Sequence, residues 1–177
     1  MGRPKLLMPW GQSTVLASTL AALRDGGVGA IVVVLAPQGP LASWQPPAGV
    51  RIVVNPEPVK GMLSSVLAGL AALVGSPDPL LVCPADLPAL RADTVAALLA
   101  TYRESGGIVV PRHGRRRGHP LVIAPVWQAR MPGLAHHDNG LRRILELAAG
   151  AVHELPVDDP GSIHDVDTPE DYAALLP

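Results

Sequence analysis

Phenylalanine is absent from the 177-residue sequence, and aromatic residues make up only 3% of it. A core must therefore be built from aliphatic side chains, which suits the buried strands of a parallel sheet. Hydrophobic residues still reach 48%, against 16% charged residues, and the mean hydropathy is +0.28. This composition excludes a chain that is disordered because of low hydrophobicity and high charge. The length is that of a single domain, which we expect to cover residues 1–177.

Cysteine and net charge are nearly absent as well. The only cysteine, Cys83, excludes an intrachain disulfide. It ends an apolar run and is expected to be a small buried hydrophobe in a reducing, cytoplasmic protein. The 14 basic and 15 acidic residues leave a net charge of −1, so no global field attracts nucleic acid or an anionic membrane. No apolar run approaches the roughly 18 residues of a membrane span.

Short β-branched runs alternate with Ala- and Leu-rich stretches along the chain. Strands are predicted over 30–35, 51–54, 80–83, 108–110, 120–123 and 152–155. Helices are predicted over 14–24, 62–74, 93–104 and 140–149, and from Thr168 onward. Ser13 or Thr14 is expected to cap the first of these helices, and Asp93 the third. The alternation predicts an α/β fold with a mostly parallel sheet and an antiparallel hairpin over 108–123.

Asp86 is the first candidate for chemistry. It lies between two prolines directly after a buried strand, at the sheet edge where open α/β folds bind ligands. A carboxylate there can bind magnesium, which prefers one or two carboxylates together with phosphate oxygens and water. The alternative is an aspartate that only accepts hydrogen bonds from the amides of its own turn.

The C-terminal segment carries further acids. Thr168, Pro169 and an acid at the third helical position form a capping box, which accounts for the acids at 170 and 171. Capping does not explain Asp165 and Asp167. We expect them to face opposite sides, one toward a metal and the other toward solvent or backbone. Asp86 and Asp165 would then suffice for a magnesium site, and the alternative is a solvated acidic cluster.

Three other segments are weaker candidates. Residues 1–5 bring a glycine and a lysine before a helix, which suits phosphate binding or a frayed basic terminus. At Gly61–Ser65, free amides and two hydroxyls begin a helix and can bond a base or a phosphate, although N-capping by Ser64 or Ser65 is the simpler interpretation. The basic loop over 115–120 is either a solvated hairpin tip or a phosphate clamp.

Five segments in this order resemble one family. They are Met1–Gly11, Gly61–Val66, Pro84–Pro88, Gly118–Pro120 and Asp165–Asp171. Together they resemble the molybdenum cofactor cytidylyltransferases and the wider MobA-like nucleotidyltransferases, over essentially the whole chain. The resemblance implies a three-layer, Rossmann-like nucleotidyltransferase fold. It also implies transfer of CMP from CTP to the phosphate of molybdopterin carrying molybdenum, with release of pyrophosphate.

The resemblance also implies roles for single residues. Lys5 and Asp86 would be catalytic, with Lys5 on the nucleotide phosphates. Asp86 and Asp165 would hold Mg²⁺. The nucleotide would further contact Gly61, Ser64 and Ser65. The acceptor would lie against Gly118, His119 and Pro120.

The family begins with a strand and a loop of the form L-A-A-G-x-S-x-R immediately before the run M-G-x-P-K, and this chain starts at that Met. We therefore expect the first strand to be missing, a gap beside the strands at 30–35 and 80–83, and a start codon further upstream. A molybdenum hydroxylase apoprotein is an implied partner. Two alternatives stay open. One is a non-catalytic protein that binds nucleotide or molybdopterin, and the other is a related transferase with another phosphorylated acceptor.

Overall fold

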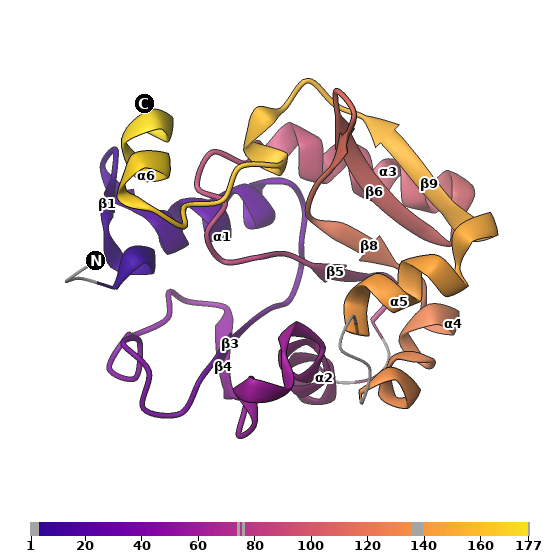
Figure 1. Cartoon of the computed structure of the whole chain (residues 1–177), viewed down its shortest axis with the longest axis horizontal. Coiled ribbons are helices and arrows are strands. Elements are labelled where there is room, and N and C mark those ends of the chain that lie inside the picture. The colour runs from indigo at the N-terminus through magenta and orange to yellow at the C-terminus, as the bar shows by residue number, and fades with distance from the viewer. Residues whose placement is uncertain (1–3, 74, 76, 136–139, 177) are drawn as a thin grey trace.

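The computed structural model describes residues 4–73, 75, 77–135 and 140–176. Two expectations fall partly outside these residues, namely those on residues 1–5 and on the end of the helix predicted over 62–74. Figure 1 shows an α/β arrangement in which strands alternate with helices along the chain. None of the helices in the described part of the chain has the length and apolarity needed to span a bilayer.

The strands form two main groups. In the first, β3 (Ile31–Leu35) and β4 (Val50–Val54) pair in parallel. In the second, the order is β5 (Leu80–Val82), β8 (Leu121–Ile123), β6 (Ile108–His113) and β7 (Arg116–Arg117), and β9 (Val152–Pro156) pairs with β6. Only β9 pairs in parallel within this second sheet, because β8 runs against both β5 and β6. The sheet is therefore mixed. The expected hairpin over 108–123 is present, because β6 pairs antiparallel with β8 and, at its tip, with β7. A small ribbon of β1 (Pro9–Trp10) and β2 (Ser13–Thr14) lies apart.

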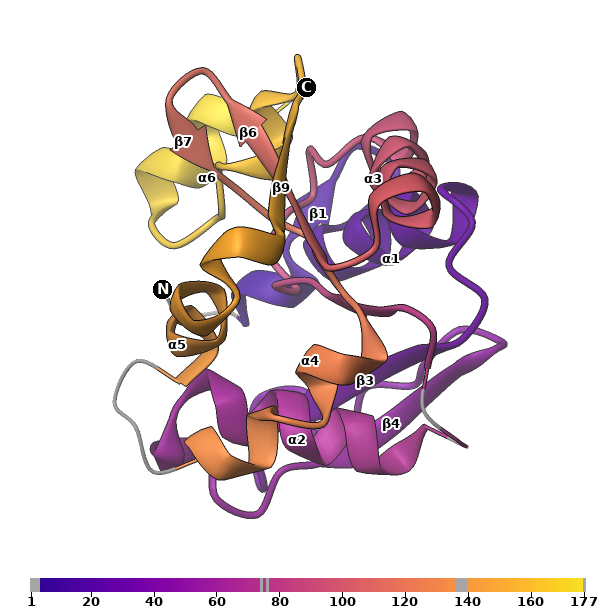
Figure 2. The ribbon, with the colours of Figure 1, turned by 90° about the vertical axis from the view of Figure 1, so that its right-hand side faces the viewer.

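Helices cover both faces of the strands. The α-helices are α1 (Val15–Asp25), α2 (Met62–Ala72), α3 (Ala92–Ser105), α4 (Pro125–Gln128), α5 (Gly140–Leu147) and α6 (Pro169–Leu175). Short 3₁₀ turns are η1 (Lys5–Leu7), η2 (Pro58–Lys60), η3 (Met131–Leu134), η4 (Ala149–Ala151) and η5 (Pro160–Ser162). Figure 2 shows α1 and α3 on one side of the strands and α2, α4 and α5 on the other. Strand alternation explains these layers, since Ile108 and Val110 pack under α2 and α5 while Val109 packs under α1 and α3.

Two of the four predicted helix caps are present. The Thr14 hydroxyl accepts a hydrogen bond from Ala17 N at the start of α1, and Thr168 and Asp171 form the capping box of α6. The prediction for Asp93 is wrong, because α3 has Arg91 at its N-cap and Asp93 lies exposed in the first turn. The carboxylate that accepts from this helix start comes from a distant part of the chain.

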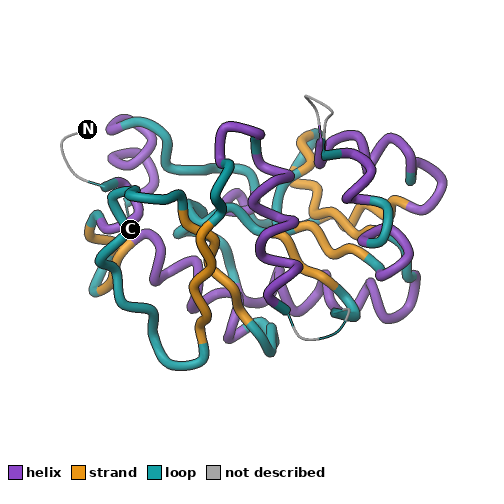
Figure 3. The backbone as a smooth tube through the Cα atoms, turned by 90° about the horizontal axis from the view of Figure 1, so that it is seen from below, coloured by secondary structure: helices purple, strands orange, loops and turns teal. Residues whose placement is uncertain are grey.

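The gap expected in the sheet is present. β3 pairs only with β4 and β5 only with β8 among the described strands, so the two edges face each other without a ladder between them. Figure 3 shows the strands in separate groups. Between β3 and β5 lies a groove of about 490 Å³, lined largely by apolar side chains of α1, α2 and the two strands. The sheet does not close over this groove.

Candidate functional site

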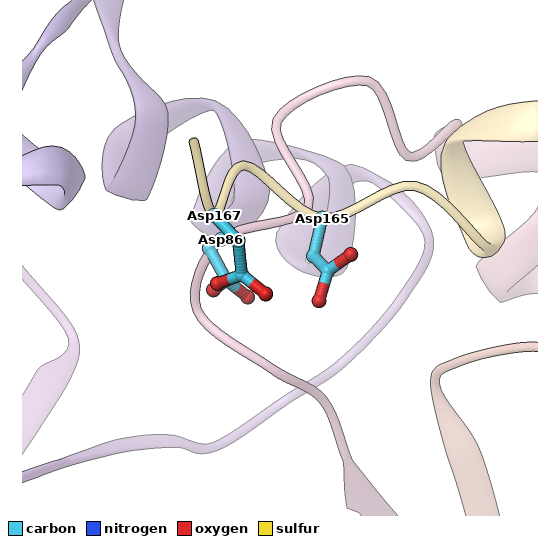
Figure 4. A group of neighbouring side chains, drawn as sticks. All are labelled: Asp86, Asp165 and Asp167. Carbon is cyan, nitrogen blue, oxygen red and sulfur yellow. The ribbon is translucent and has the colours of Figure 1, made fainter. Parts of the chain in front are cut away.

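Three carboxylates converge beyond the end of β5. Asp86 lies on the loop after β5, while Asp165 and Asp167 lie on the extended segment between η5 and α6. One oxygen of each carboxylate lies within 4.8 Å of the other two, and Figure 4 shows the three side chains grouped together. The expected approach of Asp86 and Asp165 across 79 positions (165 − 86) is thus confirmed.

The expectation that Asp165 and Asp167 face opposite sides is wrong. In an extended segment, residues two positions apart share a face and the residue between them points the other way. Val166 is that residue, and its side chain is fully buried. The Val166 N–H donates to the backbone oxygen of Asp86 at 3.1 Å. Both aspartates therefore face the Asp86 carboxylate, and sequence reasoning missed Asp167 although its Asp-x-Asp spacing was the available signal.

Lys5 places its ammonium among these acids. Its Nζ donates to Asp86 Oδ2 at 2.7 Å and to Asp167 Oδ1 at 2.6 Å. Burial lowers the pKa of Lys5, but the hydrogen bonds and charges of Asp167 and Asp86 outweigh it and leave the pKa raised. Lys5 is therefore a cation that compensates two of the three carboxylates. Its expected contact with nucleotide phosphates stays a prediction.

The donor set fits a small divalent cation. All three groups offer hard oxygen ligands, which suit Mg²⁺ and Mn²⁺. Octahedral Mg²⁺ with ligands near 2.1 Å needs oxygens about 3 to 4.2 Å apart, close to the 4.8 Å limit found here. The Asp86 side chain is 15% exposed and that of Asp167 is 62% exposed. A cation would therefore be bound near the surface, between a mostly buried carboxylate and an exposed one. It would have to compete with the Lys5 ammonium.

The proposed acceptor loop lies against the same acidic segment. The His119 N–H donates to Ser162 O at 2.8 Å. A Cβ on Gly118 would lie 2.2 Å from that oxygen, so only glycine allows this approach. Burial lowers the pKa of His119, while the charges of Asp165 and Asp86 raise it by less. Burial thus shifts His119 toward the neutral imidazole, beside the carboxylates.

The turn at the start of α2 differs from its expected capping. Neither Ser64 nor Ser65 is the N-cap, because Gly61 takes that position with a positive φ of 85° and no side-chain cap bond. Glycine is the residue that adopts such a φ without strain. The Ser64 hydroxyl instead donates to Gly61 O at 2.8 Å.

Asn55 organises this turn, and sequence reasoning missed it. Asn55 is only 3% exposed. Its Nδ2 donates to Ser64 Oγ at 2.8 Å and Ser65 Oγ at 3.1 Å, and its Oδ1 accepts from Glu57 N. Its place directly after β4, at the same kind of strand end as Asp86, was the signal that could have found it.

The basic hairpin is tied to its neighbour. Arg112 and Arg117 both pair with Glu154 on β9, at 3.1 and 2.7 Å. Arg117 of the basic loop therefore already has a carboxylate partner. This pairing does not involve Arg115 or Arg116, and the phosphate clamp stays a prediction.

Comparisons with known proteins agree with this architecture. The sequence model of the MobA-like NTP transferase domain matches residues 1–155. This range includes Asp86 and His119 but ends before Asp165. The phosphoenolpyruvate guanylyltransferase of Nocardia farcinica is 34% identical over 164 residues, which are 89% of this chain and 69% of that protein. The molybdenum cofactor cytidylyltransferase of Escherichia coli is 23% identical over 97% of this chain and 86% of that protein.

Solved structures share the fold. The crystal structure of Rv0371c from Mycobacterium tuberculosis superposes with a TM-score of 0.82 at 26% identity, covering 99% of this chain and 90% of that one. The same protein has also been solved in complex with manganese, with a TM-score of 0.79 at 28% identity, covering 99% and 92% of the two chains. An α/β nucleotidyltransferase fold is therefore shown for this chain.

Proposed function

The chain belongs to the MobA-like NTP transferase family, and we propose that it is a magnesium-dependent cytidylyltransferase of one domain. It transfers CMP from CTP to the phosphate of molybdopterin carrying molybdenum and releases pyrophosphate. The observation that carries nucleotidyl transfer is the convergence of Asp86, Asp165, Asp167 and Lys5 at one strand end. The choice of acceptor rests on the similarity to the Escherichia coli cytidylyltransferase.

The reaction needs charge stabilisation more than proton transfer. An oxygen of the acceptor phosphate attacks the α-phosphorus, and the bond to the leaving pyrophosphate breaks. That oxygen is already negative, so no side chain has to remove a proton. Asp86, Asp165 and Asp167 would hold Mg²⁺, which supplies positive charge to the phosphates when bound. Lys5 would be free to donate to phosphate oxygens when Asp86 and Asp167 hold the metal.

The nucleotide and the acceptor would approach from different loops. Gly61, Ser64 and Ser65 would contact the nucleotide at the start of α2, chiefly through the serine hydroxyls, because the amides of Gly61 and Ser64 already donate to Pro58 O and Gly61 O. Their resemblance to the cytidylyl turn favours CTP. The loop of Gly118, His119 and Pro120 would receive the acceptor, with the His119 imidazole, whose pKa burial lowers, beside the acids. A molybdenum hydroxylase apoprotein in the cytoplasm would be the partner that takes the product.

A second candidate is guanylyl transfer to phosphoenolpyruvate or to another small phosphorylated acceptor. The Nocardia farcinica guanylyltransferase favours it, because its identity of 34% exceeds the 23% of the cytidylyltransferase. Both candidates use the same metal site and the same displacement at phosphorus. They differ in the base that the turn over 61–65 would bind and in the acceptor that the loop over 118–120 would bind.

Pyrophosphate release distinguishes these functions. The purified protein is incubated with Mg²⁺, CTP or GTP, and either molybdenum-loaded molybdopterin or phosphoenolpyruvate. We expect release with CTP and the loaded pterin. Release with GTP and phosphoenolpyruvate would support the second candidate, and tight nucleotide binding without any release would support a non-catalytic binding protein.

The metal assignment has its own variant. Asp86→Ala is expected to lower turnover by roughly 10²-fold or more, by analogy with the loss of one transition-state stabiliser. Asp93→Ala, an exposed acid on α3, is the matched control and should leave turnover unchanged. Magnesium-dependent turnover that survives in Asp86→Ala would overturn the assignment.

A further inference from the structure

The acidic ligands lie on two loops that meet again away from the metal site. One loop runs from Asp86 to the start of α3, and the other runs from η5 to Asp167. At the metal end they are joined by the bond from Val166 N to Asp86 O. What fixes their opposite end is the side chain of Asp159, which lies beyond the part of the chain that the family's sequence model matches.

Asp159 is a buried carboxylate with three donors. The residue is 2% exposed. Its Oδ2 accepts from Arg91 N at 3.0 Å and from Thr94 Oγ1 at 2.7 Å, and its Oδ1 accepts from Gly161 N at 3.0 Å. A buried charge is tolerated only where such partners replace water. The N-terminus of the 14-residue helix α3 adds the favourable end of its dipole.

These bonds join both loops at one point. Arg91 and Thr94 belong to the α3 side, and Gly161 belongs to the η5 side. The two backbones touch here, since a Cβ on Gly161 would lie 2.1 Å from Ala89 O. No side chain fits between them, so this close approach of the loops requires glycine at position 161.

The same point also holds the proposed acceptor loop. The backbone oxygen of Asp159 accepts from Ser162 Oγ at 2.7 Å. Ser162 O in turn accepts from His119 N at 2.8 Å. Ser162 is fully buried, so solvent does not loosen this chain of bonds.

We propose that Asp159 is a positioning residue that sets the spacing of Asp86 and Asp165, and so the affinity for the metal. It touches neither metal nor substrate and acts through the two loops. The inference rests on the proposed function, because it assumes that the three acids bind a divalent cation.

Manganese binding to the full chain tests this directly. Mn²⁺ affinity is measured by electron paramagnetic resonance for the wild type and for Asp159→Asn, at a temperature where circular dichroism shows both folded. The amide has nearly the same size but turns one acceptor oxygen into a donor that faces N–H or O–H groups. We expect the dissociation constant for Mn²⁺ to rise at least tenfold.

Two further variants keep the test decisive. Ile144→Ala removes a fully buried side chain of α5, in the core cluster that this helix forms with α2 and β6. It should lower the melting temperature while leaving Mn²⁺ affinity unchanged. If Asp159→Asn does not fold, Thr94→Val removes one of the three donors and should raise the dissociation constant two- to threefold.

The outcomes separate the two ideas. A wild type that does not bind Mn²⁺ would end the proposed metal role itself. If the wild type binds Mn²⁺ and Asp159→Asn, or Thr94→Val where it is used instead, binds with the same affinity, the positioning role alone is overturned. An equal loss of affinity in Ile144→Ala would also overturn it, because general loosening would then explain the effect.

Discussion

The strands β8 and β4 are both rich in apolar residues but differ in how deeply they are buried. All three residues of β8, Leu121–Ile123, are buried, whereas none of the five residues of β4, Val50–Val54, is buried. β8 lies between β5 and β6 with helices on both faces, while β4 pairs only with β3, whose other edge faces the groove. A strand's burial is therefore decided by how many neighbours its sheet supplies, and Val and Ile content alone does not determine it.

The same difference divides the candidate site. The acidic ligands are anchored to the packed half, through the loop after β5 and the buried Asp159. The turn proposed to bind the nucleotide is attached to the open half, through Asn55 after β4. Changes in the packed half should therefore affect metal binding, and changes in the open half should affect nucleotide binding.

Filling the groove should have the largest effect. A chain extended ahead of Met1 by the strand and glycine-rich loop of the family would pair with both β3 and β5. Several backbone groups at about 1–3 kcal/mol each would add on the order of 5 kcal/mol, which raises the melting temperature by roughly 10–20 °C. Thermal melts of both lengths, with and without Mg²⁺ and CTP, measure this. Equal melting and equal stabilisation by CTP would show that the groove needs no strand.

Cys83 lines the groove, so the reaction rate of its thiol measures the environment there. Burial, with a smaller contribution from the charge of Asp86, raises the pKa of its thiol to about 12. At pH 8 the thiolate is then scarce, and reaction with a disulfide reagent should be slower than for a free thiol by on the order of 10³-fold. Unfolding in guanidinium should restore the normal rate. A rate near that of a free thiol in the folded protein would contradict this environment.

Matched core substitutions test the contrast between the halves. Ile123→Ala in β8 empties a fully buried position and should cost about 2–5 kcal/mol of the free energy of unfolding. Ile52→Ala in β4 removes the same atoms from a partly exposed position and should cost less than about 2 kcal/mol. Chemical denaturation of both variants gives the comparison. Equal losses would mean that β4 is packed as tightly as β8.

The pH dependence of stability gives the smallest effect. Because the pKa of His119 is lowered in the folded protein, the unfolded chain binds more protons as the pH falls below about 6.5. The free energy of unfolding should therefore fall on acidification from pH 7 to 5, measured without metal. His119→Gln should reduce this slope. Asp165→Asn removes a charge that raises the pKa and should make the slope steeper, so a shallower slope would contradict the assignment.

Local signals predicted much of the fold. The alternating apolar runs placed the strands and helices, and the caps at Thr14 and Thr168 follow from short-range hydrogen bonds. The cap expected from Asp93 failed because Asp159, 68 residues from Arg91, takes that role. Short-range rules contain no information about such a partner.

The sequence by itself determined the α/β class, the aliphatic core and the family motifs that single out Asp86 and Lys5. Only the tertiary structure decided that Asp167 joins the acids, that Lys5 bonds to partners 81 and 162 positions away, and that a groove separates β3 from β5. The physical reason is range. Propensity and periodicity act over a few residues, whereas the position of a charge depends on loops that long-range packing brings together.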